Sequence, residues 1–91
     1  MGVIVRIPTP LRRFTRGSEQ VELQATDVRS LIDGLEELHP GLRERLLDEN
    51  GVRRFVNLYV GEEDVRFLDG LETRLRDGDE VSIVPAMAGG G

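Results

Sequence analysis

Short stretches of β-branched and alternating apolar residues predict a chain rich in strands. The first stretch, residues 3–7, is dominated by valine and isoleucine and ends at Pro8. In residues 21–25, apolar side chains alternate with polar ones, which is the period of a half-buried strand. The whole pattern predicts five strands, at residues 3–7, 21–25, 55–60, 64–68 and 80–84.

One longer stretch has the spacing of an amphipathic helix. Apolar side chains recur at intervals of three and four between Val28 and Leu38, so they form one stripe along a helix. Thr26 is the expected N-cap, and Pro40 ends the helix. A shorter second helix is predicted at residues 42–47. The stripe consists of Val28, Leu31, Ile32, Leu35 and Leu38.

The order strand, strand, helix, strand, strand, strand predicts one two-layer α+β domain. The chain has 91 residues, which is too few for a second independent core. A mixed sheet with one main helix packed on one face fits a β-grasp, the ubiquitin-like fold, with the first and last strands as central parallel neighbours. We expect this domain at residues 1–86 and a flexible glycine-rich tail at 87–91. The predicted core contains Val5, Val21, Leu31, Leu35, Leu58 and Ile83.

Composition narrows the classes of function. The formal net charge is -5, which disfavours nucleic acid as a partner and favours a partner with a basic docking surface. The sequence has neither an apolar run near the ~20 residues of a membrane span nor a signal-peptide core, so we expect a cytoplasmic protein without a membrane partner. All twelve basic residues are arginine, so no internal lysine is available for an isopeptide bond.

The side chains of the chain suggest no catalytic or metal site. There are no cysteines, and the single histidine, His39, stands beside Pro40, where a helix end is the simpler interpretation. The acidic segments 62–64 and 77–80 are typical of solvated turns, because neither has the ligand spacing of a calcium loop. We therefore expect no metal, no cofactor and no enzyme activity of the chain itself.

The informative feature is the glycine tail. Gly89, Gly90 and Gly91 follow the last predicted strand through only four residues, 85–88. Glycine has no side chain, so such a tail can enter a narrow channel on another protein. Extended, residues 85–91 reach on the order of 20 Å. These glycines are the candidate carriers of a reactive C-terminal carboxylate.

Several segments together resemble the ThiS/MoaD sulfur-carrier family. They are Phe55–Val60 and Glu63–Phe67, then Asp77–Val81, then Pro85–Gly90, and the opening Val5–Thr9 resembles the CysO branch in particular. The resemblance implies that an E1-like, ATP-dependent enzyme adenylates the terminal glycine and that sulfur then replaces AMP to give a thiocarboxylate. In the CysO branch the sulfur passes to a pyridoxal-phosphate-dependent cysteine synthase, and a metalloprotease releases the cysteine.

The tail departs from the family pattern in one respect, since the family ends in two glycines and this chain in three. Aligned from Pro85, Gly90 is the last family position, so either Gly91 is the reactive terminus or it must be removed first.

A docking surface for partners is also predicted. If Val56, Leu58 and Val60 face the helix, the period of a strand turns the residues between them outward. An apolar patch beside the tail would then suit a partner enzyme, as the matching face does in related carriers. The patch consists of Tyr59, Phe55, Val84 and Met87.

Other functions fit the same tail. A carrier for molybdopterin or thiamin biosynthesis, of the MoaD or ThiS kind, would use the same chemistry. A ubiquitin-like modifier would join the tail to lysines of target proteins, and a plain β-grasp binding module would leave the tail idle.

Overall fold

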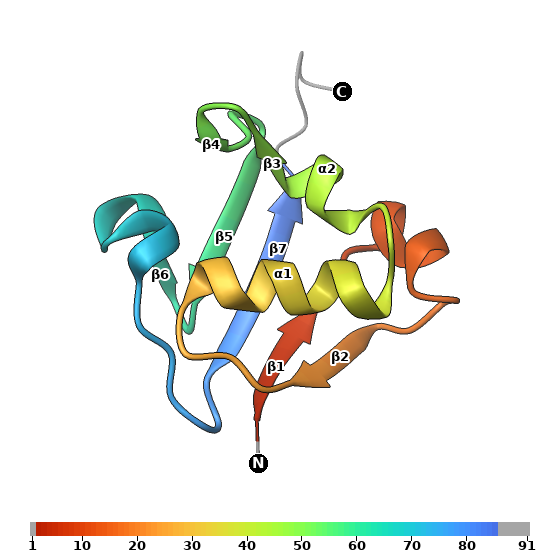
Figure 1. The fold of residues 1–91 in the computed structure, drawn as a ribbon, viewed down its shortest axis with the longest axis horizontal. Coiled ribbons are helices and arrows are strands. Elements are labelled where there is room, and N and C mark those ends of the chain that lie inside the picture. The colour runs from red at the N-terminus through yellow and green to blue at the C-terminus, as the bar shows by residue number, and fades with distance from the viewer. Residues whose placement is uncertain (1, 86–91) are drawn as a thin grey trace.

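The computed structural model describes residues 2–85, which form a sheet with its main helix packed across one face (Figure 1). The helices are α1 (Val28–Leu38) and α2 (Leu42–Leu46), with short 3-10 helices η1 (Thr9–Phe14), η2 (Val65–Phe67) and η3 (Gly70–Glu72). The strands are β1 (Val3–Arg6), β2 (Gln20–Leu23), β3 (Leu47–Asp48), β4 (Gly51–Val52), β5 (Val56–Val60), β6 (Glu63–Asp64) and β7 (Glu80–Pro85).

The main sheet has the order β2-β1-β7-β5-β6. Strand β1 pairs antiparallel with β2 and parallel with β7, and β7 pairs antiparallel with β5. Strands β3 and β4 form a separate hairpin. The predicted hairpin of the first two strands and the central parallel pair are both confirmed, and with them the β-grasp. This topology brings the C-terminal ends of β1 and β7 and the N-terminal end of β5 to one end of the sheet.

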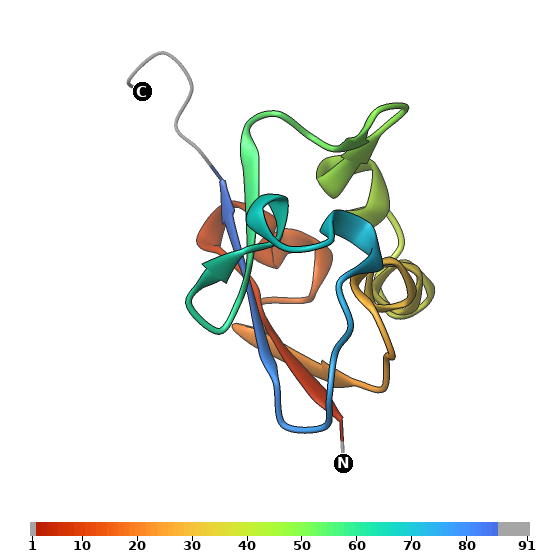
Figure 2. The same ribbon diagram turned by 90° about the vertical axis from the view of Figure 1, so that its left-hand side faces the viewer.

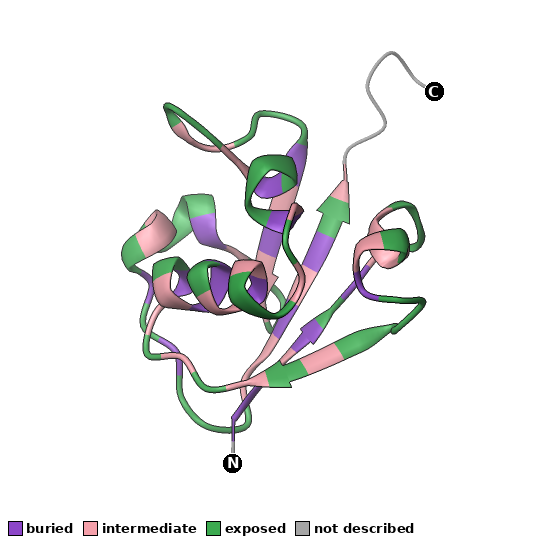
Figure 3. Ribbon diagram, turned by 45° about the vertical axis from the view of Figure 1, so that its right-hand side comes forward, coloured by how far each residue is buried: buried purple, intermediate pink, exposed green. Residues whose placement is uncertain are grey.

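The core lies between this sheet and α1, where Figure 3 shows purple bands of buried residues on the helix and on the central strands. Because neighbouring side chains of a strand point to opposite faces, every second residue of the central strands is buried. Helix α1 contributes its predicted stripe as far as Leu35, and α2 adds Leu42 and Leu46. The strand residues of the core are Val3, Val5, Val56, Leu58, Val81 and Ile83.

Two apolar residues that the sequence predicts to face the core are not fully buried. Leu38 is 55% exposed, because it is the last residue of α1 and the apolar layer continues instead through Leu42 and Leu46 of α2. Val21 packs against the core but is only partly buried, because β2 is the edge strand of the sheet. The other predicted core residues are buried, namely Val5, Leu31, Leu35, Leu58 and Ile83.

The N-cap of α1 is Asp27, so the prediction of Thr26 was wrong by one residue. The Asp27 carboxylate accepts a hydrogen bond from the backbone N–H of Ser30 at 2.8 Å, and the Ser30 hydroxyl accepts one from the backbone N–H of Asp27 at 3.2 Å. This reciprocal pair satisfies donors that a helix start otherwise leaves free. The backbone hydrogen bond from Ser30, assisted by the Ser30 hydroxyl, lowers the pKa of Asp27.

Removing this cap should destabilise the domain in a pH-dependent way. We expect Asp27→Ala to lower the free energy of unfolding by about 0.5–2 kcal/mol at neutral pH. A lowered pKa in the folded state means that the charged carboxylate stabilises the fold above its unfolded-state pKa, near 3.9. The difference between the two proteins should therefore shrink as the pH falls below about 4. Urea unfolding across this range measures it, and a difference independent of pH would contradict it.

The predicted strand at residues 64–68 was wrong beyond its first residue. Strand β6 contains only Glu63 and Asp64, and η2 follows at once. The Asp64 carboxylate accepts a hydrogen bond from the backbone N–H of Arg66 at 2.8 Å, and such a local bond favours a turn over an extended strand. The helical turn buries Val65 but leaves Phe67 85% exposed.

Helix η1 lies in the connection between β1 and β2. Its last residue, Phe14, packs against the backbone of Gly41, where an added Cβ would lie 2.9 Å from the ring. Gly41 also has a φ of 107°, which glycine adopts without strain. This contact holds η1 beside α2, because α2 begins at Leu42, directly after Gly41.

Within residues 2–85, no helix is both long and apolar enough to cross a membrane. The same part of the chain holds no group of three or more histidine or acidic side chains able to bind a metal ion.

Candidate functional site

The candidate site lies at the end of the sheet where β7 terminates. Pro85, the last residue of β7, pairs with Val56 at the start of β5. Strand β7 therefore ends beside the start of β5. The predicted tail residues Gly89, Gly90 and Gly91 lie outside the described residues, as does Met87 of the predicted docking patch.

Two of the remaining members of the predicted patch, Tyr59 and Val84, share one face of the sheet. Leu58 and Ile83 form a buried cross-strand pair, so the alternate positions Tyr59 and Val84 point to the opposite face. Val84 is 42% exposed and Phe55, which directly precedes β5, is 52% exposed. Tyr59 is only partly buried and pairs with Ser82, which lies two residues before Val84 in β7. The structure thus places Phe55 and Val84 near the end of the sheet where β7 terminates, and Tyr59 further from that end.

Arg66, a residue that the sequence analysis missed, holds the segment that carries Phe55. Its guanidinium donates hydrogen bonds to the backbone carbonyls of Arg53 at 2.9 Å, Arg54 at 3.3 Å and Val56 at 2.7 Å. It also donates to the side-chain oxygen of Asn57. The planar guanidinium with its five donors suits such a cluster of acceptors, and a lysine would not replace it.

The error at residues 64–68 explains why Arg66 was missed. A strand there would place Arg66 on a sheet face, whereas η2 turns its side chain toward the segment before β5. The only available signal was Asp64 two residues before Arg66, since an aspartate at that spacing favours a local turn.

The other residues considered in the sequence analysis belong to a helix end and a turn. His39 is the C-cap of α1, and its backbone N–H donates to the Leu35 carbonyl at 2.7 Å. The turn predicted at Asp77–Asp79 is confirmed, and it leads into β7.

Comparison with known protein families identifies the family of the chain. The family model described as the ThiS family matches residues 5–90. The chain belongs to the ThiS family. Among its relatives in the ThiS family, the sulfur carrier protein CysO of Mycobacterium tuberculosis is 46% identical over 93 residues, which is 99% of this chain and 100% of that protein. The resemblance found in the sequence is confirmed.

Solved structures of the CysO kind match this ThiS-family chain closely. A chain of the crystal structure of the Amycolatopsis orientalis BexX/CysO complex has a TM-score of 0.93 and 46% identity, with 97% of this chain and 99% of that chain covered. The crystal structure of Mycobacterium tuberculosis CysO, described as an antigen, has a TM-score of 0.90 and 44% identity, with 94% and 100% covered.

Proposed function

We propose that this chain is a sulfur carrier whose C-terminal glycine carboxylate is adenylated and then converted to a thiocarboxylate. In the first step a carboxylate oxygen attacks the α-phosphorus of ATP on an E1-like activating enzyme, and pyrophosphate leaves. In the second step sulfur from a donor attacks the acyl carbon, so that a C–S bond forms and AMP departs. The chain is the substrate of these steps and supplies no catalytic side chain.

The family match over residues 5–90 is the observation that carries this proposal. It runs through β7 and continues to Gly90, so it includes the segment that would hold the reactive group. The names of the relatives agree, since they describe carriers of sulfur rather than enzymes. The fold supports the same role, because β7 is held on both sides, by β1 and β5, and is a rigid base for whatever follows it.

We further propose that the sulfur enters cysteine biosynthesis. The similarity to proteins named CysO over the full length of the chain supports this acceptor. On this proposal a pyridoxal-phosphate-dependent cysteine synthase accepts the sulfur and a metalloprotease releases the product. A molybdopterin or thiamin pathway, or a modifier role, would use the same tail with a different acceptor.

The patch of Phe55, Val84 and Tyr59 is the proposed contact for these enzymes. Aromatic residues are enriched at protein interfaces, and two of these three are exposed beside the end of β7. Met87 would extend the patch. The hydrogen bonds from Arg66 hold the Phe55 segment in place before binding, which reduces the ordering cost of association.

The experiment is reconstitution. The full chain is incubated with ATP and the activating enzyme encoded in the same genome, and released pyrophosphate is measured. A sulfur donor is then added, and intact-mass spectrometry follows the gain of one S-for-O exchange. We expect both signals. A chain ending at Gly90 is tested in parallel. It should be at least as active if Gly91 is a remnant of processing, and nearly inactive if Gly91 is the reactive residue.

Two results would reject the proposal. Isopeptide-linked adducts on target proteins without any thiocarboxylate would favour the modifier. If neither form of the chain releases pyrophosphate with several related activating enzymes, the sulfur-carrier assignment fails and a binding module remains.

A further inference from the structure

Three separate segments that carry arginines lie at the end of the sheet where β7 terminates. Helix η1 follows the C-terminal end of β1, and the segment 53–55 precedes the N-terminal end of β5, so both lie at this end. Helix α2 joins them there, because the backbone N–H of Arg53 donates to the Leu46 carbonyl at 2.9 Å. We call this region the basic end; its arginines are Arg12, Arg13, Arg16, Arg45, Arg53 and Arg54.

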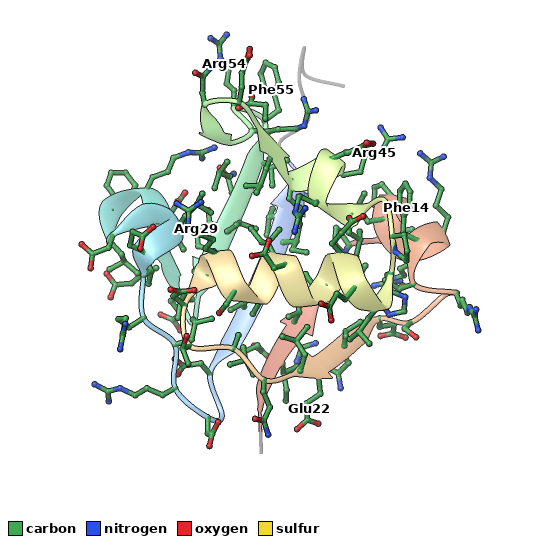
Figure 4. All side chains as sticks on the ribbon, viewed as in Figure 1. Phe14, Glu22, Arg29, Arg45, Arg54 and Phe55 are labelled. Atoms are coloured by element: carbon green, nitrogen blue, oxygen red, sulfur yellow. The ribbon has the colours of Figure 1, made fainter. Side chains whose placement is uncertain are left out.

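Direct contacts connect these segments. The guanidinium carbons of Arg13 and Arg45 lie 5.0 and 5.4 Å from the centre of the Phe14 ring, which joins η1 to α2. Arg53 donates from Nε to the Glu44 carbonyl at 2.7 Å. Figure 4 shows Phe14 and Arg45 beside each other at this end, with Arg54 and Phe55 above β4.

The positive charge of the basic end is not neutralised by direct pairing within residues 2–85. The ion pairs of that part of the chain use other arginines, namely Arg6, Arg29, Arg43 and Arg66. Neither residues 8–17 nor residues 53–61 contain an acidic side chain. The nearby negative groups are Glu44 of α2, Asp48 and Glu49 of the β3–β4 hairpin, Glu36, whose carboxylate accepts hydrogen bonds at the start of α2, and Glu19, which follows η1 and bonds to Ile7. None of these carboxylates forms an ion pair with the six arginines within residues 2–85, so the basic end keeps unpaired guanidinium groups and a small excess of positive charge.

The opposite end of the sheet is acidic. The turn at Asp77–Asp79 lies beside the start of β1, because the backbone N–H of Gly78 donates to the Gly2 carbonyl at 2.9 Å. Glu62 lies in the turn that leaves β5 at this end. In Figure 2 β7 ends near the top of the molecule, and the turn before β7 lies at the bottom. A chain with a formal net charge of -5 is thus positive at the one end that faces a tail-accepting partner.

We propose that the basic end docks on an acidic rim around the entrance through which a partner enzyme receives the C-terminal residues. This proposal rests on the sulfur-carrier function and adds the charge of the surface that recognises the carrier. The negative net charge of the chain favours a partner with a basic surface, whereas the arginines of the basic end favour an acidic one. Phe55 and Val84 lie at the same end and would form the apolar centre of the contact, with the arginines as its rim.

A protein fits this surface better than a nucleic acid. A long polyanion would extend past the basic end and meet the acidic end, where like charges repel. An acidic protein rim is local, and it would also orient the carrier with β7 pointing toward the entrance. Charges at the rim of an interface act mainly on the association rate and its dependence on salt.

The test compares two charge-reversed forms of the full chain. Arg13→Glu with Arg54→Glu alters the basic end. Arg74→Glu with Arg76→Glu alters the segment that leads into the Asp77–Asp79 turn and changes the net charge by the same amount. Circular dichroism checks the fold of each. Association with the activating enzyme of the same genome is followed by biolayer interferometry at several ionic strengths, without ATP.

We expect the basic-end variant to associate at least about tenfold more slowly than the unchanged chain at low salt, with a weaker dependence on salt. The control should stay within about twofold. Arg13→Gln with Arg54→Gln should show a smaller loss of association rate, and this variant tests the proposal if the charge-reversed form does not fold.

Four results would overturn the proposal. They are equal effects of the two charge-reversed forms, no effect at either end, faster association of the basic-end variant, and no association of the unchanged chain. Release of pyrophosphate without this charge dependence would leave the carrier function standing and reject the basic end as its docking surface.

Discussion

Gly90→Val should abolish adenylation of the chain without unfolding its domain. A branched side chain next to the carboxylate would block a channel that accepts only backbone, and it would displace the reacting atoms from their productive geometry. The buried core is formed by residues 3–83, so the free energy of unfolding should stay near that of the unchanged chain. Pyrophosphate release and a thermal melt of the same preparation measure both quantities.

Gly90→Ala is the matched control for this prediction. It adds a single methyl group and should retain part of the activity, so that the rate falls in the order glycine, alanine, valine. If the valine form were adenylated as fast as the unchanged chain, the entrance of the partner would be wide and the role assigned to the glycines would be wrong. A valine form that melts much earlier would instead indicate that Gly90 contributes to the domain.

Leu35→Ala should remove a large share of the stability of the domain. The Leu35 side chain is 0% exposed and belongs to the core between α1 and the sheet. Replacing a buried leucine by alanine costs about 2–5 kcal/mol where the surroundings cannot collapse onto the cavity. Domains of this kind have a free energy of unfolding of about 5–15 kcal/mol. Urea unfolding followed by circular dichroism gives the difference directly.

The same helix offers a control three residues later. Leu38 is 55% exposed, and Leu38→Ala should change the free energy of unfolding by no more than about 0.5 kcal/mol. The two substitutions remove the same atoms from the same helix, and they differ mainly in burial, since Leu38 is the last residue of α1. Similar losses at both positions would show that the core does not lie on the Leu35 side of α1.

The elements that the sequence predicts well are those in which one face is buried. Strands β1, β5 and β7 and helix α1 follow from apolar periodicity, because each must place one set of side chains against the core. The errors arise where a local hydrogen bond decides the backbone. Asp64 bonds to the N–H of Arg66 and turns a predicted strand into η2, and the pair of Asp27 and Ser30 moves the helix cap by one residue.

The sequence likewise predicts one part of the candidate site and misses another. Alternation along β5 and β7 predicts that Tyr59 and Val84 share a face, and the register of the sheet places them there. Composition cannot predict the basic end, since it gives a net charge of -5 without saying which arginines fold together. Arg13 and Arg45 are far apart in the sequence and meet at the Phe14 ring, and Arg54 lies at the same end of the sheet because it shortly precedes β5.

The position of β7 also affects the order in which the chain can fold. The ribosome makes this strand after the other strands of residues 2–85, yet it lies between β1 and β5 in the finished sheet. Until it arrives, the facing edges of β1 and β5 have no partner, and open edges of this kind invite pairing with other chains. A nascent or prematurely stopped chain without residues 80–85 lacks its central strand and two buried side chains, Val81 and Ile83. Copies that reach the folded state are therefore those already translated to the strand from which the glycines extend.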